Sequence, residues 1–228
     1  MDYLFPPALL ASVAIAGSAQ RFPVHRIYCI GRNYADHAKE MGASVDRGNP
    51  VFFCKPADAV VADRTQIPYP LGTTELHHEV EMVVALQSGG ANIAQAQALK
   101  HVFGYAVGLD LTRRDLQATA KAKSLPWDSS KAFDQSAPVS ALRSVAQIGH
   151  PQQARLALSV NDAMRQQADI SEMIFRVPEI IGELSKLWEL APGDLIFTGT
   201  PAGVAALQRG DHFRAELGDI AACEGRIV

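Results

Sequence analysis

His77-His-Glu-Val-Glu-Met-Val-Val84 is the stretch around which the rest of this 228-residue chain is organised. Two carboxylates, Glu79 and Glu81, stand two positions apart among apolar residues. In a β-strand, residues i and i+2 point to the same face, so the two carboxylates should lie side by side while their neighbours are buried. Adjacent buried carboxylates repel each other, and they must share a proton, meet a cationic side chain or bind a cation.

A third acid, Asp110, closes another apolar run that begins at Val102. Three carboxylates from strand positions offer the hard oxygen ligands that Mg²⁺, Mn²⁺ and Ca²⁺ prefer. The simpler interpretation places Glu79 and Glu81 on a solvated sheet face, and the E-x-E pattern alone favours it. The choice between the two interpretations depends on the rest of the chain.

Composition excludes several classes of protein. The chain is 48% hydrophobic, which is enough for a large core, and its net charge of −3 with no basic stripe disfavours nucleic-acid binding. Three cysteines without C-x-x-C spacing argue against a disulfide framework or a zinc site and fit a reducing cytoplasm. The apolar residues 8–19 follow an acid, Asp2, and no base, so we expect neither a signal peptide nor a membrane span.

The segment from Gly31 to Met41 predicts a helix that Asn33 caps and Gly42 ends. His37 and Glu40 are three residues apart, so they share one face of this helix and can touch. A carboxylate beside an imidazole orients it and raises its basicity, so the pair could activate a water molecule. The alternative is an ordinary solvated helix face, which the spacing alone favours.

A second helix is expected after Asp110, capped by Asp110 or Thr112 and continuing to Lys123. Arg113, Arg114 and Gln117 lie in its first turns, close in sequence to the proposed metal, although surface salt bridges would also explain the two arginines.

Two loops carry further candidates. Lys131 lies in the polar loop 124–136, which also holds Trp127 and Phe133, and it could pair with an anion unless it is simply solvated. In the turn 199–203, backbone amides and the Thr200 hydroxyl could bind a carboxylate.

The remaining pattern favours α+β architecture. Strands outnumber helices and do not alternate with them, so mixed or antiparallel sheets are expected rather than a doubly wound fold. We expect a hairpin of 154–160 with 163–167 around Asn161-Asp162, a helix opened by Pro178, and two last strands around Gly218. Residues 1–228 are interpreted as one domain, in which residues 1–25 form an N-terminal arm or hairpin.

Five motifs together resemble the fumarylacetoacetate hydrolase family from about Arg26 to the last strands. They are Ile30-Gly-Arg-Asn-Tyr-Ala-Asp-His-Ala-Lys-Glu-Met41, Leu76-His-His-Glu-Val-Glu81, Gly104-Tyr-Ala-Val-Gly-Leu-Asp-Leu-Thr-Arg-Arg-Asp-Leu-Gln117, Lys131-Ala-Phe133 and Phe197-Thr-Gly-Thr-Pro-Ala-Gly-Val204. The resemblance implies that family's mixed β-roll with peripheral helices, a homodimer, and a Mg²⁺ or Mn²⁺ site, with Ca²⁺ possible in a crystal.

The resemblance also assigns roles to individual residues. It implies Glu79, Glu81 and Asp110 as metal ligands, a water-activating dyad of His37 with Glu40, and Lys131 as a catalytic donor to an oxyanion. The substrate contacts that it implies are Arg32, Tyr34, Arg114, Gln117 and Thr200. Asp162 departs from the family's usual glycine, but aspartate tolerates left-handed conformations, so the hairpin should be kept.

Within the family, the chain looks most like bacterial fumarylpyruvate hydrolases, or acylpyruvases. This similarity implies a cytoplasmic, metal-dependent hydrolase of a carbon–carbon bond in a 2-oxo acid, with fumarylpyruvate favoured, acting in the degradation of aromatic compounds. Decarboxylation of oxaloacetate or isomerisation of a 2-hydroxydienoate would use the same site. A metal-binding protein without turnover is the third alternative, against which the His37–Glu40 pair argues.

Overall fold

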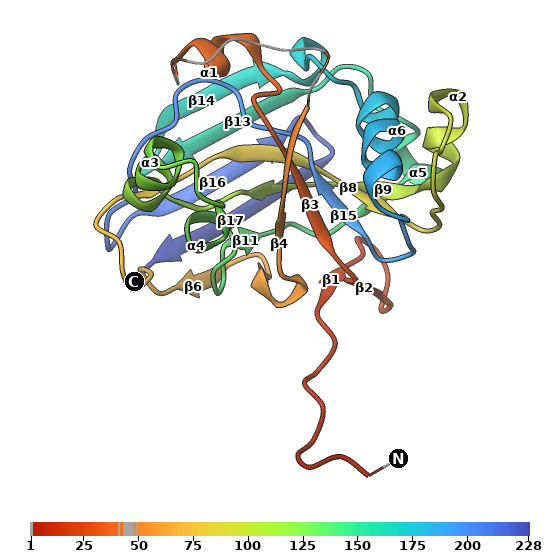
Figure 1. The fold of residues 1–228 in the computed structure, drawn as a ribbon, viewed down its shortest axis with the longest axis horizontal. Coiled ribbons are helices and arrows are strands. Elements are labelled where there is room, and N and C mark those ends of the chain that lie inside the picture. The colour runs from red at the N-terminus through yellow and green to blue at the C-terminus, as the bar shows by residue number, and fades with distance from the viewer. Residues whose placement is uncertain (1, 41, 43–47, 49) are drawn as a thin grey trace.

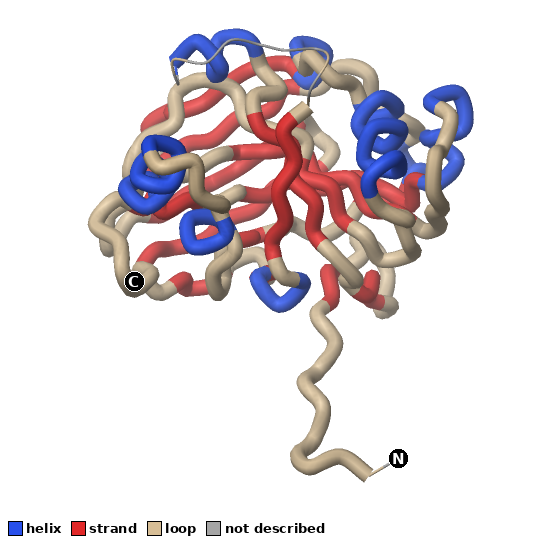
Figure 2. Tube along the Cα trace, in the orientation of Figure 1, coloured by secondary structure: helices blue, strands red, loops and turns tan. Residues whose placement is uncertain are grey.

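Two sheets form the body of the protein in a computed structural model, which describes residues 2–40, 42, 48 and 50–228 (Figure 1). The first sheet has the strand order β12-β9-β8-β15-β3-β4, and the second has the order β14-β13-β16-β17-β6. Most neighbours are antiparallel, but β15 pairs with β3 and β17 pairs with β6 in parallel. Figure 2 shows strands through the interior and helices at the periphery, which confirms the α+β mixed β-roll.

The elements have the following bounds. The first sheet consists of β3 (Ile27–Gly31), β4 (Val51–Lys55), β8 (Val80–Leu86), β9 (Val102–Leu109), β12 (Arg143–Ser144) and β15 (Leu195–Phe197). The second consists of β6 (Thr65–Ile67), β13 (Arg155–Val160), β14 (Ala163–Asp169), β16 (His212–Leu217) and β17 (Ala221–Ile227). Short strand pairs are β1 (Ser12–Ala14) with β2 (Arg21–Pro23), β7 (Leu76–His77) with β10 (Thr112–Arg113), and β5 (Val60–Val61) with β11 (Ala137–Pro138).

The helices are short and lie outside the sheets (Figure 2). They are α1 (Ala35–Glu40), α2 (Gln95–Ala98), α3 (Arg114–Ala122), α4 (Asp128–Lys131), α5 (Val145–Ile148) and α6 (Val177–Leu187), with 3₁₀ turns at Ala57–Ala59, Leu99–His101 and Ile170–Glu172. None of the helices in the described ranges is long and apolar enough to cross a bilayer.

Strand β8 is buried on both faces, and its alternation positions the acids. Val80, Met82 and Val84 belong to the core between the two sheets, where β8 and β9 face β13, β16 and β17. Val83 and Ala85 belong to a second core beneath the β1–β2 hairpin. Because side chains alternate along a strand, Glu81 lies on the same side as Val83 and Ala85, away from the main core.

Several sequence predictions are confirmed. Strands β13 and β14 pair around Asn161 and Asp162, whose φ angles of 50° and 62° are those of a two-residue hairpin turn. Strands β16 and β17 form the last hairpin around Gly218. The expected apolar stripe of α6 is buried in the core, with Pro178 in the first turn of the helix.

The predicted helix starts were wrong in two places. Helix α1 begins at Ala35, because the Asn33 side chain is used elsewhere: it donates to the carbonyls of Phe175 and Thr198 and accepts from the Phe175 N–H. The expected last residue of this helix, Met41, lies outside the described residues. Helix α3 begins at Arg114, so neither Asp110 nor Thr112 caps it, because residues 112–113 pair with β7 as a strand.

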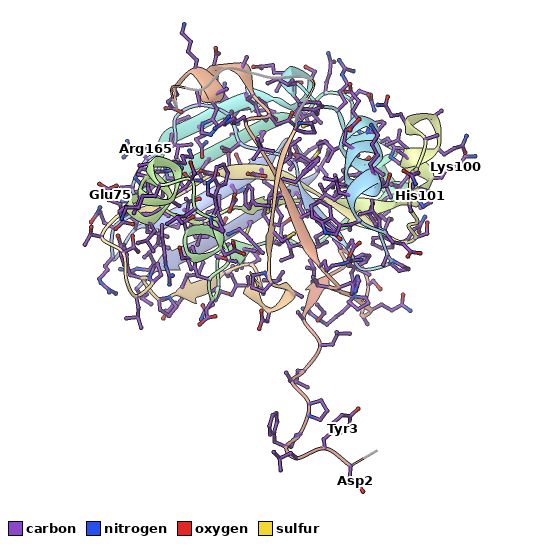
Figure 3. All side chains as sticks on the ribbon, viewed as in Figure 1. Asp2, Tyr3, Glu75, Lys100, His101 and Arg165 are labelled. Carbon is purple, nitrogen blue, oxygen red and sulfur yellow. The ribbon has the colours of Figure 1, made fainter. Side chains whose placement is uncertain are left out.

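The segment 124–136, predicted as a loop, contains the short helix α4. At the other end of the chain, residues 2–10 carry no helix or strand and extend away from the body (Figure 1). Figure 3 shows Asp2 and Tyr3 far from the sheets, and the side chains of Leu4 and Leu9 are 97% and 98% exposed.

Candidate active site

One cavity collects most of the predicted functional side chains. It lies where β8, β9 and the loop after β3 meet α3 and α4. The residues that line it are Ile30, Gly31, Arg32, His37, Phe53, Glu79, Glu81, Asp110, Arg114, Gln117, Lys121, Trp127, Lys131 and Thr200.

Antiparallel pairing of β8 with β9 brings the three acids together. Glu81 stands opposite Gly108, and the Asp110 N–H donates to the Glu79 carbonyl over 2.9 Å. One ligand oxygen from each of the three carboxylates lies within 4.8 Å of the other two. All three residues are buried, so the solvated-face interpretation of the E-x-E pattern is wrong.

Three cations compensate two of these acids. Lys131 Nζ donates to Glu79 over 2.8 Å and to Asp110 over 2.5 Å, and an Arg114 guanidinium N–H donates to Glu79. Lys55 Nζ lies 2.8 Å from the second carboxylate oxygen of Asp110, in a geometry that makes no hydrogen bond. Burial opposes ionisation of Glu79, but the charges of Lys131 and Arg114 lower its pKa.

Glu81 has a different environment from its two neighbours. Its only hydrogen bond among the described residues comes from the Gly199 N–H, over 2.6 Å. Burial, together with the charges of Asp110 and Glu79, raises the pKa of Glu81 well above its ordinary value. None of the three cations pairs with Glu81 among the described residues, so a bound divalent cation would be the partner that favours its ionised form.

The donor set fits a hard divalent cation. All three candidate ligands are carboxylates. Among the described residues, Oδ1 of Asp110 accepts no hydrogen bond, and Glu81 accepts one, at Oε2 from the Gly199 N–H. Mg²⁺ and Mn²⁺ bind such oxygen ligands, and three protein ligands leave coordination positions for water or substrate. Glu79, Glu81 and Asp110 would hold the metal.

His37 faces the same cavity from α1. Its Nδ1 lies 3.3 Å from Oε2 of Glu40, and Glu40 in turn accepts from the Gly203 N–H over 3.2 Å. Burial lowers the pKa of His37 below 6.5, although the charges of Glu79 and Glu40 partly oppose that effect. The imidazole is therefore neutral at pH 7, as a general base must be.

Gln117 and Thr200 can donate hydrogen bonds to a ligand in the cavity, because the side-chain oxygen of each already accepts a hydrogen bond from the protein. The Gln117 side-chain oxygen accepts from Arg114, which leaves its amide N–H groups for a ligand. Thr200 Oγ1 accepts from Gln166 over 2.8 Å, so its hydroxyl proton can be donated elsewhere. Both residues line the cavity, and Thr200 is only 3% exposed.

Lys131 lines the cavity, whereas Tyr34 is not among the residues that line it. An ammonium group has three N–H donors, and those of Lys131 go to Glu79, Asp110 and Thr112. The predicted role of Lys131 as a donor to an oxyanion stays a prediction. Tyr34 packs in the main core, and its predicted contact with a substrate stays a prediction.

The sequence interpretation missed Phe53, Lys55 and Lys121, whereas it had noted Trp127 as an aromatic residue of a loop that could line a site. Lys55 is the one buried residue of β4, at its end. Lys121 lies one turn beyond Gln117 on α3, so helical spacing could have indicated it. Phe53 and Trp127 form an aromatic wall with ring centroids 5.8 Å apart. No local signal in the sequence indicates that Phe53 or Lys55 reaches this cavity.

Comparison with known proteins identifies the family of the chain. Residues 26–228 match the family described as "Fumarylacetoacetate (FAA) hydrolase C-terminal". The chain belongs to this family of enzymes, as its motifs predict.

Two solved structures are similar to the whole chain. The crystal structure of fumarylpyruvate hydrolase from Pseudomonas aeruginosa, in complex with Mn²⁺ and pyruvate, is 47% identical and covers 100% of this chain and 99% of its own, with a TM-score of 0.97. A putative fumarylpyruvate hydrolase from Burkholderia cenocepacia is 50% identical and covers 100% of this chain and 98% of its own, with a TM-score of 0.93.

A curated relative is named for a reaction that differs from that of the two hydrolases above. The mitochondrial oxaloacetate tautomerase of Rattus norvegicus is 42% identical over 201 residues, which are 88% of this chain and 90% of the relative. The family therefore includes proteins similar to this chain that carry the names of two different reactions.

Proposed function

We propose that this protein is a metal-dependent acylpyruvate hydrolase whose favoured substrate is fumarylpyruvate, cleaved to fumarate and pyruvate. The observation that carries the proposal is a neutral, carboxylate-supported histidine facing the same cavity as three clustered carboxylates. Similarity over the whole chain to a fumarylpyruvate hydrolase crystallised with Mn²⁺ and pyruvate supports this choice of substrate.

The 2-oxo acid end of the substrate would be held beside the acidic cluster. A divalent ion bound by Glu79, Glu81 and Asp110 would supply Lewis-acid polarisation of the 2-oxo acid. Gln117 and Thr200 present N–H and O–H donors on the cavity wall, and a substrate carboxylate accepts such donors. Arg114 keeps its Glu79 contact and fixes the orientation of Gln117.

His37 would generate the nucleophile. With Nδ1 directed at Glu40, its Nε2 is the nitrogen left to accept a proton from water. The hydroxide adds to the acyl carbonyl carbon, and the bond between this carbon and the neighbouring methylene then breaks. The electron pair of that bond leaves as the pyruvate enolate, which takes a proton at carbon to give pyruvate, while the acyl group becomes the carboxylate of fumarate.

The test is a measurement of products from purified protein, with Mn²⁺ and with EDTA. The proposal predicts equimolar fumarate and pyruvate from fumarylpyruvate, and loss of this activity when the metal is removed. Release of no pyruvate in the presence of Mn²⁺ would contradict it.

Tautomerisation of oxaloacetate is the second candidate, because a curated relative 42% identical over 88% of this chain is an oxaloacetate tautomerase. This reaction moves a proton between oxygen and carbon and breaks no carbon–carbon bond, so His37 could serve it without a nucleophilic water. Ketonisation of enol-oxaloacetate, followed by its ultraviolet absorbance, distinguishes the two activities. The same assays, extended to oxaloacetate decarboxylation and 2-hydroxydienoate isomerisation, cover the remaining alternatives.

The cellular setting and the oligomeric state are part of the proposal. We expect the enzyme to act in the cytoplasm as a homodimer, in the degradation of aromatic compounds.

A further inference from the structure

The cavity contains more positive side chains than its acids use. Lys131 and Arg114 both contact Glu79, as described above. Arg32 and Lys121 line the same cavity, but within the described part of the chain neither has a carboxylate within 4.0 Å. Two cations without acidic partners in a cavity of this kind are positioned to bind an anion.

The backbone around Arg32 is fixed in an unusual conformation. Its φ angle is 61°, in the left-handed region that residues other than glycine seldom adopt. The next residue, Asn33, is buried and makes three hydrogen bonds that fix the backbone at this point. Backbone strain of this kind is retained where the surrounding structure imposes it, often at ligand sites.

Lys121 belongs to the last turn of α3 and lines the same cavity as Arg32. Its ammonium lies 5.3 Å from the centre of the Trp127 ring, so the aromatic face supports the charge. Burial and the neighbouring charges of Arg114 and Arg32 lower the pKa of Lys121. A bound anion would relieve this crowding of like charges.

We propose that Arg32 and Lys121 bind a second, distal carboxylate of the substrate, so that the site selects acylpyruvates whose acyl group ends in a carboxylate. This inference rests on the proposed hydrolase function and adds its substrate class. Phe53 and Trp127 line the cavity and supply apolar walls for a planar, conjugated acyl chain held between polar groups at its two ends.

The charge count favours a substrate with more than one negative charge. Three carboxylates and a divalent ion leave one negative charge, and Lys55, Lys131 and Arg114 reverse it to two positive charges. Arg32 and Lys121 raise the total to four positive charges, and a monoanionic acylpyruvate held at its 2-oxo acid end would leave both of these cations unpaired. An acyl group with a terminal carboxylate supplies the missing partner.

The first test compares two substrates that differ at the distal end, fumarylpyruvate and acetylpyruvate. Lys121→Met removes the ammonium and keeps the side-chain length beside Trp127, and Arg32→Asn removes the guanidinium and tolerates the left-handed conformation. Each variant should lower the ratio of kcat/KM for fumarylpyruvate to that for acetylpyruvate by about tenfold or more, which is the size of one charge-assisted hydrogen bond. Lys123→Met removes an equal charge from the end of the same helix but outside the cavity, and it should leave the ratio within about twofold of the parent.

The second test measures binding without turnover. Calorimetry of the Mn²⁺-loaded protein should show that fumarate binds more tightly than crotonate, which has a methyl group in place of one carboxylate, and that Lys121→Met removes this preference. An unchanged substrate ratio and an unchanged binding preference in both variants would overturn the subsite. If the parent cleaves neither acylpyruvate, the hydrolase proposal fails, whereas the comparison of fumarate with crotonate still decides whether the subsite exists.

Discussion

Glu40 Oε2 lies 3.3 Å from Nδ1 of His37, and the other oxygen of the same carboxylate accepts from the Gly203 N–H. Helix α1 is thereby joined to the turn that carries Thr200. The candidate base and a candidate substrate donor therefore lie on segments that Glu40 joins, and both residues line the cavity. Glu40 does not line the cavity itself, so it acts on the chemistry through His37.

Replacing His37 tests the hydrolytic role of this pair. His37→Ala should lower kcat for acylpyruvate cleavage by roughly 100-fold or more, because it removes the group that deprotonates water. Metal affinity should stay close to that of the parent, since His37 is not among the carboxylate ligands. Oxaloacetate decarboxylation, if the parent shows any, should fall less, because it needs no hydroxide. Hydrolysis at the parental rate would contradict the dyad.

Glu40→Gln tests the direction in which the carboxylate acts. His37 must be neutral to accept a proton, so the acidic limb of the pH–rate profile reports its pKa. Glu40 raises that pKa against the larger lowering effect of burial. Without the carboxylate the pKa should fall further, and the acidic limb of kcat/KM should move to lower pH. Movement to higher pH would show that Glu40 has another role.

The metal assignment predicts a change in ligand-induced stability. Mn²⁺ should raise the Tm of the parent, because an ion that binds only the folded state stabilises it. Glu81→Ala should remove most of this gain together with the metal-dependent activity. Asp219→Ala, in the exposed β16–β17 turn, deletes an equal charge and should keep the parental response. A full Mn²⁺ response in Glu81→Ala would show that the ligand set is wrong.

Lys131 is expected to stabilise the metal-free protein rather than to contact the reacting atoms. Lys131→Met leaves the buried carboxylates of Glu79 and Asp110 without their shared cation, and breaking a buried ion pair in this way costs about 3–5 kcal/mol of unfolding free energy. Urea denaturation without metal measures the loss, and Mn²⁺ should restore more stability to this variant than to the parent. Lys186→Met, which breaks an exposed pair with Glu183, should change stability by about 0.5 kcal/mol or less. Equal stability of Lys131→Met and the parent would contradict this role.

The predicted homodimer can be tested by measuring the mass of the protein in solution, and the N-terminal arm offers apolar side chains that a partner could cover. Residues 2–10 expose Leu4, Phe5, Leu9 and Leu10, which soluble chains normally cover. Light scattering should give a mass of about twice 24.5 kDa. A mass of one chain at micromolar concentration would contradict the prediction.

The features that the sequence predicted correctly depend on local patterns. Alternation in β8 placed Glu79 and Glu81 on one side of a buried strand, and the Asn161-Asp162 pair predicted a hairpin turn. Spacing of three placed His37 beside Glu40 on one helix face. Each of these relationships involves residues a few positions apart, where backbone geometry alone determines which side chains meet.

The features that were missed depend on contacts between distant segments. Asn33 is a typical helix-capping residue, but its side chain donates hydrogen bonds to the carbonyls of Phe175 and Thr198, more than 140 residues away. Lys131 was expected to meet an anion, as it does, but the sequence does not indicate that Glu79 and Asp110 are the groups that accept its hydrogen bonds. The polar groups that decide these positions come from segments distant in the sequence, and no local pattern in the sequence indicates them.

Hydrolysis of fumarylpyruvate in ¹⁸O-labelled water by the Mn²⁺-loaded enzyme is the measurement that tests the central claim most directly. The hydroxide that His37 generates becomes part of the new carboxylate. We therefore predict pyruvate and fumarate in equal amounts, with one ¹⁸O in each fumarate molecule, and loss of both products in His37→Ala. Rapid ketonisation of enol-oxaloacetate by the same preparation, with no labelled fumarate and no release of pyruvate, would contradict the hydrolase and identify proton transfer as the reaction.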